Sequence, residues 1–383
     1  MTLSALQETL NSPRRADYRG ATVAAAFADP QVELPVLLSG CGIYDLGFRA
    51  RISLSGGDRV RWLNGMVTNN IRDLAMGQGI YAFLLNPQGR ILGDLHAFTL
   101  GESLIVETDR SQVEKILATF DHYIIMDEVE VSNLSDQFTA IGVSGPKSRT
   151  VLQAAGVEFP ELQPLQSFAA QCDCECGCLE CTIIRGEGAL RDSYEIWLAP
   201  AYVKQLWDAL LKAGGTAVGS EAQEMRRILA GVPLYGVDIR ERDLPQETEQ
   251  MRALNFNKGC YVGQEIVERI RSRGSVHRKF TGYASRSGEG QIAPGAKVLI
   301  GEKEVGEVTS ATTLNTSQDA SQGNGKAQST VALGYIRREY AASRNEVTIA
   351  GAKAWVVELP LRETAAPDGE KPAGAKVSTS STN

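Results

Sequence analysis

Hydrophobic positions along the chain predict an α+β protein. Apolar residues recur three or four positions apart in segments that we interpret as helices, namely residues 58–66, 113–120, 203–210 and 221–230. Between these helices, strand-like runs bounded by turn residues predict strands over 79–108 and a hairpin over 183–198. Short helices mixed with hairpins favour mainly antiparallel sheets, with the helices in the N-terminal two-thirds of the chain.

The pattern changes near residue 276. Six short strand-like runs follow, separated by turns that contain glycine and proline, and they predict a small β-barrel over 276–362. A Ser-, Gln-, Gly- and Asn-rich stretch over 313–330 indicates a mobile loop. Residues 363–383 have almost no large apolar side chain, which predicts a disordered tail.

The first 35 residues are poorly patterned. Three arginines there precede an alanine-rich stretch, and acidic residues interrupt both sides, so we expect an N-terminal arm or helix over 1–35 and not a signal peptide. The main region, 36–275, divides into subdomains of about 36–135 and 136–225. It ends in a segment, 226–275, that carries the cysteine motif described below.

Composition narrows the range of functions. The 383 residues are 43% hydrophobic and 22% charged, which is typical of a soluble globular protein of two or three domains. A formal net charge of −7 argues against non-specific binding of nucleic acid. No run reaches the roughly 18 apolar residues of a membrane span. We expect a cytoplasmic protein without a membrane or nucleic-acid partner, and we expect it to be a monomer.

Five of the seven cysteines crowd into one short segment: Cys172, Cys174, Cys176, Cys178 and Cys181. On an extended segment, the alternate spacing of the first four would place them on one face. The last two have the C-x-x-C spacing of half a zinc site, but no second pair follows and no histidine lies nearby in the sequence. The cluster is therefore either a thiol-rich metal carrier or an oxidation-prone surface hairpin, and we assign no metal ligands.

The densest group of reactive residues is the stretch N-K-G-C-Y-V-G-Q-E over 257–265. Apolar residues four apart follow it, and we expect a helix to start near Tyr261. Cys260 would then lie at a helix N-terminus, two residues from Lys258. Both neighbours stabilise a thiolate, whose free pKa of about 8.5 otherwise leaves it mostly protonated near neutrality. We therefore assign Cys260 and Lys258 as candidate catalytic residues.

The residues from Lys258 onward resemble the K-G-C-Y-x-G-Q-E motif of the YgfZ-type folate-binding proteins. These are relatives of the glycine-cleavage T protein, the aminomethyltransferase of the GcvT superfamily, and are linked to iron–sulfur cluster assembly or repair. The resemblance covers about residues 36–361 and implies a GcvT/YgfZ-like fold that binds tetrahydrofolate. Tyr261 and Gln264 within the motif are candidate folate contacts.

Three further segments carry the same resemblance. The turn over 86–94 is similar to N-x-x-G-x-I-x-x-D of the family, Glu195 lies in a (Y/F)-E-(I/L) sequence, and 227–238 is similar to R-x-E-x-G-x-P-x-x-G-x-D. The resemblance implies that Asp94 contacts the folate or accepts its proton, and that Glu195 binds the donor groups of the pterin ring. By the same resemblance, Arg227 holds the folate or its substituent.

One position departs from the family pattern, because Leu229 stands where the aminomethyltransferases have glutamate. We therefore favour a tetrahydrofolate-binding accessory protein that assembles, maintains or repairs iron–sulfur clusters in client enzymes, including radical enzymes that modify tRNA, through Cys260. The alternatives are a folate-dependent aminomethyltransferase-type enzyme and a metal carrier that uses the cysteine cluster. The basic residues over 269–279 could meet the glutamyl tail of a folate or an acidic partner.

Overall fold

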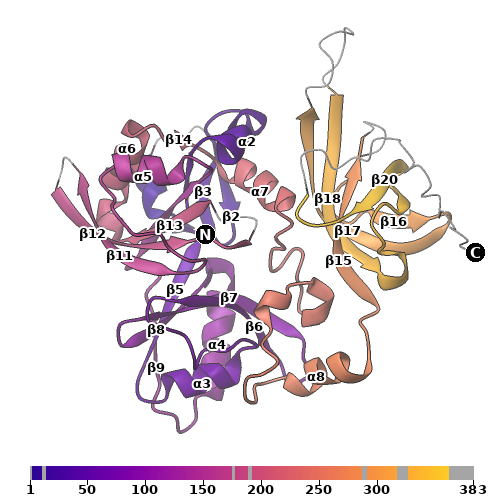
Figure 1. Cartoon of the computed structure of the whole chain (residues 1–383), viewed down its shortest axis with the longest axis horizontal. Coiled ribbons are helices and arrows are strands. Elements are labelled where there is room, and N and C mark those ends of the chain that lie inside the picture. Colours follow the sequence, from indigo (N-terminus) through magenta and orange to yellow (C-terminus); the bar gives the residue numbers. More distant parts are fainter. Residues whose placement is uncertain are drawn as a thin grey trace, which may run out of the picture.

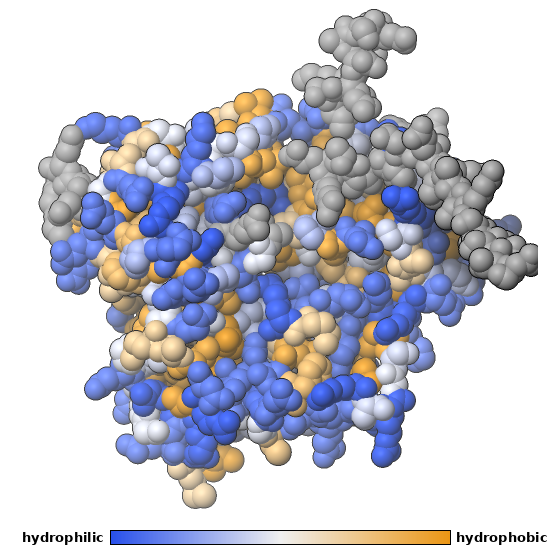
Figure 2. Space-filling model, in the orientation of Figure 1, coloured by the Kyte–Doolittle hydropathy of each residue, from blue (hydrophilic) through white to orange (hydrophobic). Residues whose placement is uncertain are grey.

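The computed structural model describes residues 2–10, 14–174, 177–188, 192–286, 291–316 and 327–361. A larger body and a β-barrel lie side by side, and helix α7 (Ser220–Leu229) lies between them (Figure 1). Hydrophilic side chains cover most of the face shown in Figure 2, and hydrophobic residues form separate patches among them. The strand pairing confirms the predicted α+β fold with mainly antiparallel sheets and a C-terminal barrel.

The first sheet of the body has six strands in the order β11-β12-β13-β10-β4-β14. Helix α6 packs on it because Leu206, Trp207 and Leu210 form one apolar stripe, which is buried in the same core as the inner face of the sheet. The elements are β4 (Gly42–Asp45), β10 (Thr139–Ser144), β11 (Ser167–Cys174), β12 (Gly177–Arg185), β13 (Ser193–Leu198), β14 (Thr216–Ala217), α1 (Ala5–Thr9), α5 (Ser148–Ala154) and α6 (Val203–Lys212).

The second sheet has five strands in the order β6-β7-β8-β5-β9. Trp62 from one helix and Phe120 from the next meet edge to face, 5.1 Å apart, in the core beneath this sheet. Both helices and the strands over 79–108 agree with the sequence pattern. The elements are β5 (Arg49–Ser55), β6 (Gly79–Leu85), β7 (Ile91–Leu100), β8 (Ser103–Asp109), β9 (Glu130–Asn133), α3 (Arg59–Met66) and α4 (Val113–Tyr123).

The N-terminal segment differs from the expected arm or helix. Its alanine-rich stretch is strand β3 (Ala21–Ala26), which pairs on both sides with β1 (Thr2–Leu3) and β2 (Arg14–Tyr18). Helix α2 (Pro30–Ser39) follows and packs against α7. Alanine has no strong β propensity, but its small side chain suits a strand that is buried on both faces and approached closely by α7.

The C-terminal barrel is closed, in the strand order β15-β18-β17-β16-β19-β20. Residues 313–316 and 327–330 lie in strands and not in the expected loop, while 317–326 and the expected tail over 363–383 lie outside the described residues. The strands are β15 (Arg278–Ser285), β16 (Lys297–Ile300), β17 (Lys303–Thr316), β18 (Ala327–Arg337), β19 (Glu346–Ile349) and β20 (Ala352–Val357).

A buried ion pair fastens the barrel to the body. Arg227 on α7 donates to the Oδ2 atom of Asp238 over 2.7 Å and to the hydroxyl of Ser310 on β17 over 2.8 Å. The other carboxylate oxygen of Asp238 accepts hydrogen bonds from Ser310 and from Thr309. Since α7 belongs to the body and β17 to the barrel, this network fixes how the two parts meet.

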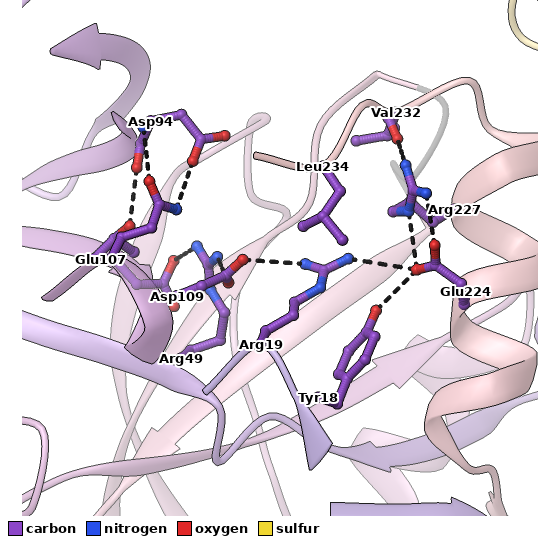
Figure 3. A network of polar contacts seen from close by, with 12 residues as sticks. Tyr18, Arg19, Arg49, Asp94, Glu107, Asp109, Glu224, Arg227, Val232 and Leu234 are labelled. Carbon is purple, nitrogen blue, oxygen red and sulfur yellow. Dashed lines mark hydrogen bonds and ion pairs between the residues drawn. The ribbon is translucent and has the colours of Figure 1, made fainter. Parts of the chain in front are cut away.

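The network continues into the body. Glu224 accepts two hydrogen bonds from Arg227, at 2.9 and 2.6 Å, and lies 3.9 Å from the guanidinium of Arg19. Arg19 in turn lies 3.7 Å from Asp109 on β8 (Figure 3). Ionised side chains therefore connect the second sheet to the barrel through α7.

We predict that removing one partner of this ion pair destabilises the protein. Arg227→Met would leave the Asp238 carboxylate buried without its cation, and loss of one partner of a buried pair costs about 3–5 kcal/mol. Urea unfolding followed by tryptophan fluorescence measures this cost.

The matched control is Arg273→Met, because Arg273 lies exposed at the end of α8 (Gln264–Arg273). Its effect should stay within about 0.5 kcal/mol. Equal stability of the two variants would contradict a stabilising role for the ion pair between Arg227 and Asp238.

Candidate functional site

A cavity of about 760 Å³ lies between the body and the barrel. The body contributes residues of β5, β7, β8, β13 and α7 to its wall, and the barrel contributes β15 and residues 356–360. This volume is in the range of small-molecule sites, which commonly form where two parts of a chain meet. Both charged and apolar side chains line the cavity, and the charged ones cluster on the body side.

The centre of that cluster is Arg49, which reaches two carboxylates on the paired strand β8. Its guanidinium lies 2.6 Å from Asp109 and 2.8 Å from Glu107 (Figure 3). Arg51, two residues along β5, lies 3.5 Å from Glu107 and stacks over the ring of Trp197. Burial alone would raise the pKa of Glu107, but Arg49 and Arg51 outweigh it and hold that pKa at about 2.

Glu195 on β13 faces this cluster from the wall of the cavity. The indole Nε1 of Trp197 donates to one of its oxygens over 3.2 Å. Burial and the neighbouring carboxyl of Glu107 raise the pKa of Glu195 to about 7, although Arg49 and Arg51 oppose the shift. The structure therefore places this sequence-predicted residue where its carboxylate could accept two N–H groups of a ligand.

His96 on β7 is a further neighbour of Arg49 in the cavity wall. The Nδ1 atom of His96 is 3.3 Å from the Arg49 guanidinium, and its Nε2 atom is 3.7 Å from Glu187. Burial, reinforced by Arg49, lowers the pKa of His96 to about 4, so the ring is neutral near pH 7. Arg252 pairs with Glu187 and stacks on Tyr81 at 4.5 Å.

Sequence reasoning missed most of this cluster. Arg49, Glu107 and Arg252 belong to no motif and come together only through the pairing of distant strands. His96 could have been found, because it follows Asp94 by two residues and therefore shares its face of the strand.

Asp94 is held by the protein beside the cavity. Its carboxylate accepts hydrogen bonds from Tyr81 at 2.7 Å and from the side chain of Gln112 at 2.8 Å. Asp94 is not among the described residues that line the cavity. Arg252 does line it, and Arg252 stacks on Tyr81. Asp94 therefore adjoins the cavity through Tyr81, and its expected contact with folate stays a prediction.

Arg227 lies in the wall of the cavity, but its donors are occupied. Its five N–H groups are directed to Glu224 twice, to the carbonyl of Val232, to Asp238 and to Ser310. These contacts give Arg227 a role in joining α7 to the barrel, and its expected contact with folate stays a prediction.

Lys258 makes structural contacts, and its expected catalytic role stays a prediction. Its buried ammonium donates to the backbone carbonyls of Asn64, Val67 and Asn69, at 2.5, 2.5 and 2.8 Å. Its three N–H groups are therefore directed to the end of α3 and not to the thiol of Cys260. Burial lowers the pKa of Lys258 to about 7. Lys258 fastens the cysteine motif to the body.

The rest of the motif forms a turn before α8. This helix begins at Gln264, three residues later than expected, because Gly263 has a φ of 81° and serves as its N-cap. Tyr261 is buried with Tyr81 and Phe83, and its backbone N–H donates to the side-chain oxygen of Gln264 over 3.3 Å. Neither Tyr261 nor Gln264 is among the described residues that line the cavity.

Cys260 is exposed on this turn, outside the described lining of the cavity. The thiol therefore faces solvent, and α8 begins four residues beyond it, later than expected; the catalytic role of Cys260 stays a prediction. An exposed thiol on a turn anchored by Lys258 and Tyr261 is accessible to a macromolecule rather than to a ligand inside the cavity.

The cysteine cluster forms a hairpin and not one extended segment, because the chain reverses between β11 and β12. Cys172 and Cys181 are buried in the core of the first sheet. The side chains of Cys174, Cys176 and Cys178 lie outside the described residues. Within the part of the chain that the structure describes, no group of three or more His, Cys, Asp and Glu is placed to hold a metal ion.

Comparison with known proteins identifies the family. The model of the GCVT N-terminal domain matches residues 14–258, and the chain therefore belongs to the GcvT superfamily. An aminomethyltransferase from Rubrobacter xylanophilus is 28% identical over 302 residues, covering 78% of this chain and 79% of the relative. Another from Picosynechococcus sp. is 26% identical over 339 residues, with 87% and 88% covered.

A solved structure has the same fold. The glycine cleavage system aminomethyltransferase T from Bartonella henselae superposes with a TM-score of 0.80 at 23% identity, covering 94% of this chain and 97% of that one. No helix among the described residues combines the length and the apolar content that crossing a bilayer requires.

We predict that Cys260 reacts much faster with a thiol reagent than the buried cysteines. Cys41, Cys172 and Cys181 are buried, and burial raises the pKa of Cys41 to about 11. A short pulse of iodoacetamide on the folded protein, followed by peptide mass spectrometry, should label Cys260 before Cys41, Cys172 and Cys181. Protection of Cys260 equal to that of Cys41 would contradict the exposed turn.

Proposed function

We propose that this GcvT-superfamily protein is of the YgfZ type: a cytoplasmic, monomeric, tetrahydrofolate-binding accessory protein that maintains iron–sulfur clusters in client proteins. The observation that carries the folate part is Glu195, a cavity carboxylate with a pKa near neutrality and with room beside it for a flat ring. Such a carboxylate complements the paired N–H donors of a pterin.

The cavity suits the rest of a reduced folate as well. When bound, tetrahydrofolate supplies N5 and N10 atoms that carry one-carbon units. On the protein side, Glu195 would hold the pterin and neutral His96 would border it. The Arg49 ion pairs keep the Glu107 carboxylate ionised beside Glu195. A volume of about 760 Å³ accommodates a ligand of this size.

Two observations support an accessory role over aminomethyl transfer. Leu229 replaces the glutamate of the family motif, and its side chain is buried among apolar residues at the contact of α7 with the barrel. Cys260 presents its thiol to solvent away from the cavity. We propose that this thiol acts on an iron–sulfur client, either as a transient iron ligand or by attacking a sulfenic acid on a cluster-ligating cysteine, which forms a mixed disulfide and releases water.

Folate-dependent aminomethyl transfer is the second candidate. It is favoured by the relatives, which are named aminomethyltransferases and match along most of their length. Asp94 lies next to the cavity, where its carboxylate is held by Tyr81 and Gln112. This function would have to operate without the carboxylate that Leu229 replaces.

We predict that folate binding strengthens as pH rises through neutrality. Glu195 accepts ligand N–H groups when ionised, and it is ionised above its pKa of about 7. The affinity for 5-formyltetrahydrofolate should therefore fall roughly tenfold between about pH 8 and about pH 6, measured by calorimetry.

Glu195→Gln should bind more weakly and should lose most of this pH dependence, because an amide cannot accept two N–H groups in the same way. The control is Glu265→Gln, since Glu265 is exposed beside the cysteine turn. A pH profile unchanged in Glu195→Gln would exclude Glu195 as the titrating group.

We further predict that Cys260 is required for cluster maintenance. In a host strain that lacks the gene, wild type should restore the activity of an iron–sulfur enzyme, such as a tRNA methylthiotransferase, under oxidative stress. Cys260→Ala should fail to restore it, although it folds and binds folate, because the thiol lies outside the cavity and makes no core contact.

Ser272→Ala on the exposed face of α8 controls for surface substitution near the turn. Equal rescue by wild type and Cys260→Ala would exclude the thiol-based function. Aminomethyl transfer to tetrahydrofolate would then be assayed directly.

A further inference from the structure

Two adjacent apolar side chains are exposed on the loop between α4 and β9. Ile125 and Met126, called the apolar pair below, expose 82% and 95% of their surface. No other large hydrophobic side chain in the described part of the chain is as exposed. Single exposed apolar residues are normal on a protein surface, whereas neighbouring ones on one loop mark a candidate contact with another molecule.

The loop that carries the apolar pair is fixed to helix α3. The backbone N–H of Glu128 donates to the carboxylate of Asp58 over 3.0 Å, and the backbone N–H of Asp58 donates to the carbonyl of Glu128 over 3.1 Å. Before the pair, the carbonyl of Tyr123 accepts a hydrogen bond from the indole of Trp62 over 3.3 Å. Because both ends of the loop are held, binding a partner there costs little ordering of the backbone.

The other end of α3 holds the cysteine turn. The backbone N–H of Val262 donates to the carbonyl of Gly65 over 3.1 Å. Gly65 follows Asp58 by seven residues, which is about 10 Å along a helix. The apolar pair and the exposed thiol of Cys260 are therefore attached to opposite ends of one short helix, at the lower end of the body in Figure 1.

The outer face of α3 connects these two ends. Arg61 is exposed, and Asn64 and Gly65 are half-buried. These positions are three and four residues apart, so they lie on one side of the helix. A Cβ atom added at Gly65 would meet no other atom within 4 Å, which shows that this side is open. A partner could therefore contact the apolar pair and the cysteine turn across the same face.

The surroundings of the apolar pair are acidic. Arg61 lies beside the loop, but it is already paired with Asp58 and Asp127, at 3.1 and 2.6 Å. Three further carboxylates are exposed on either side of the pair, at Asp121, Glu128 and Glu130. Such a rim repels the phosphates of nucleic acids and of anionic lipids, and it complements a protein whose apolar pocket is bordered by Lys and Arg. An enzyme that modifies RNA carries such basic residues, because it must bind the phosphates of its substrate.

We propose that the apolar pair and the outer face of α3 form the docking surface for the iron–sulfur client, a basic protein with an apolar pocket that takes up Ile125 and Met126. The inference rests on the proposed function and deepens it, because it names the surface that brings the client to Cys260. The apolar pair supplies the attachment, the acidic rim favours a basic partner, and α3 fixes the separation between the point of attachment and the thiol.

The test uses the double variant Ile125→Ser, Met126→Ser and the purified tRNA methylthiotransferase of the host. The affinity of the variant for this enzyme, measured by biolayer interferometry, should fall roughly 10- to 100-fold, as expected for loss of two central apolar contacts. The variant should also fail to restore the enzyme's activity in the strain that lacks the gene. The rate at which iodoacetamide labels Cys260 and the urea midpoint should stay close to those of wild type, because neither side chain is buried.

Two further variants separate the apolar and the charged contributions. Val32→Ser removes a 64% exposed apolar side chain on α2, at the opposite end of the body, and should leave affinity and rescue unchanged (Figure 1). The double variant Glu128→Lys, Glu130→Lys should also bind the enzyme more weakly, and the difference from wild type should be largest at low salt.

The outcomes distinguish this inference from the function on which it rests. If the double serine variant binds and rescues like wild type while Cys260→Ala fails to rescue, the docking surface is excluded and the thiol-based function stands. The inference is also overturned if wild type does not bind the enzyme, or if the serine variant instead loses binding to phosphatidylglycerol vesicles or loses a dimer. If Cys260→Ala rescues like wild type, the proposed function fails, and this inference fails with it.

Discussion

The buried ion pair between Arg227 and Asp238 is the interaction on which the cavity depends. The two walls of the cavity belong to different parts of the chain, and a cavity between them exists only while the barrel keeps its place on α7. Thr309 and Ser310 supply hydrogen bonds that compensate the desolvation of the pair, which is the condition for a buried ion pair to hold two elements together. Glu224 and Arg19 extend the same network to β8, next to the titratable carboxyls of the site.

Two sites of different chemistry are thereby kept apart. The cavity has charged groups, one of them the Glu195 carboxyl with a pKa of about 7, and it is enclosed by both the body and the barrel. The thiol of Cys260 is on a turn at the surface and is positioned from below by Lys258 and Tyr261. A ligand in the cavity and a protein at the thiol could therefore be bound together, which suits an accessory protein better than an enzyme with a single enclosed site.

Sequence patterns predicted the helices α3, α4, α6 and α7 and the six barrel strands, because their apolar periodicity is strong. Strand β3 was missed because a run of alanines carries no such period, and the start of α8 was misplaced because Gly263 adopts a left-handed conformation. The motifs identified both Glu195 and Arg227 as candidate site residues. A motif does not predict the hydrogen-bond partners of a residue, so the contacts of Arg227 could not be foreseen. The roles of Arg49, Glu107 and His96 could not be predicted, since they depend on pairing between distant strands.

The three backbone carbonyls that accept hydrogen bonds from Lys258 have a consequence for sequence variation. These acceptors are backbone atoms of positions 64, 67 and 69, so the side chains of Asn64 and Asn69 act on Lys258 only indirectly, through hydrogen bonds that hold the shape of this segment. Substitutions there that keep the end of α3 in shape should leave the cysteine turn intact. Position 258 itself is constrained, because only a long side chain ending in three N–H donors can donate to all three carbonyls. The turn that presents the thiol therefore tolerates many substitutions in the segment 64–69 but few at position 258.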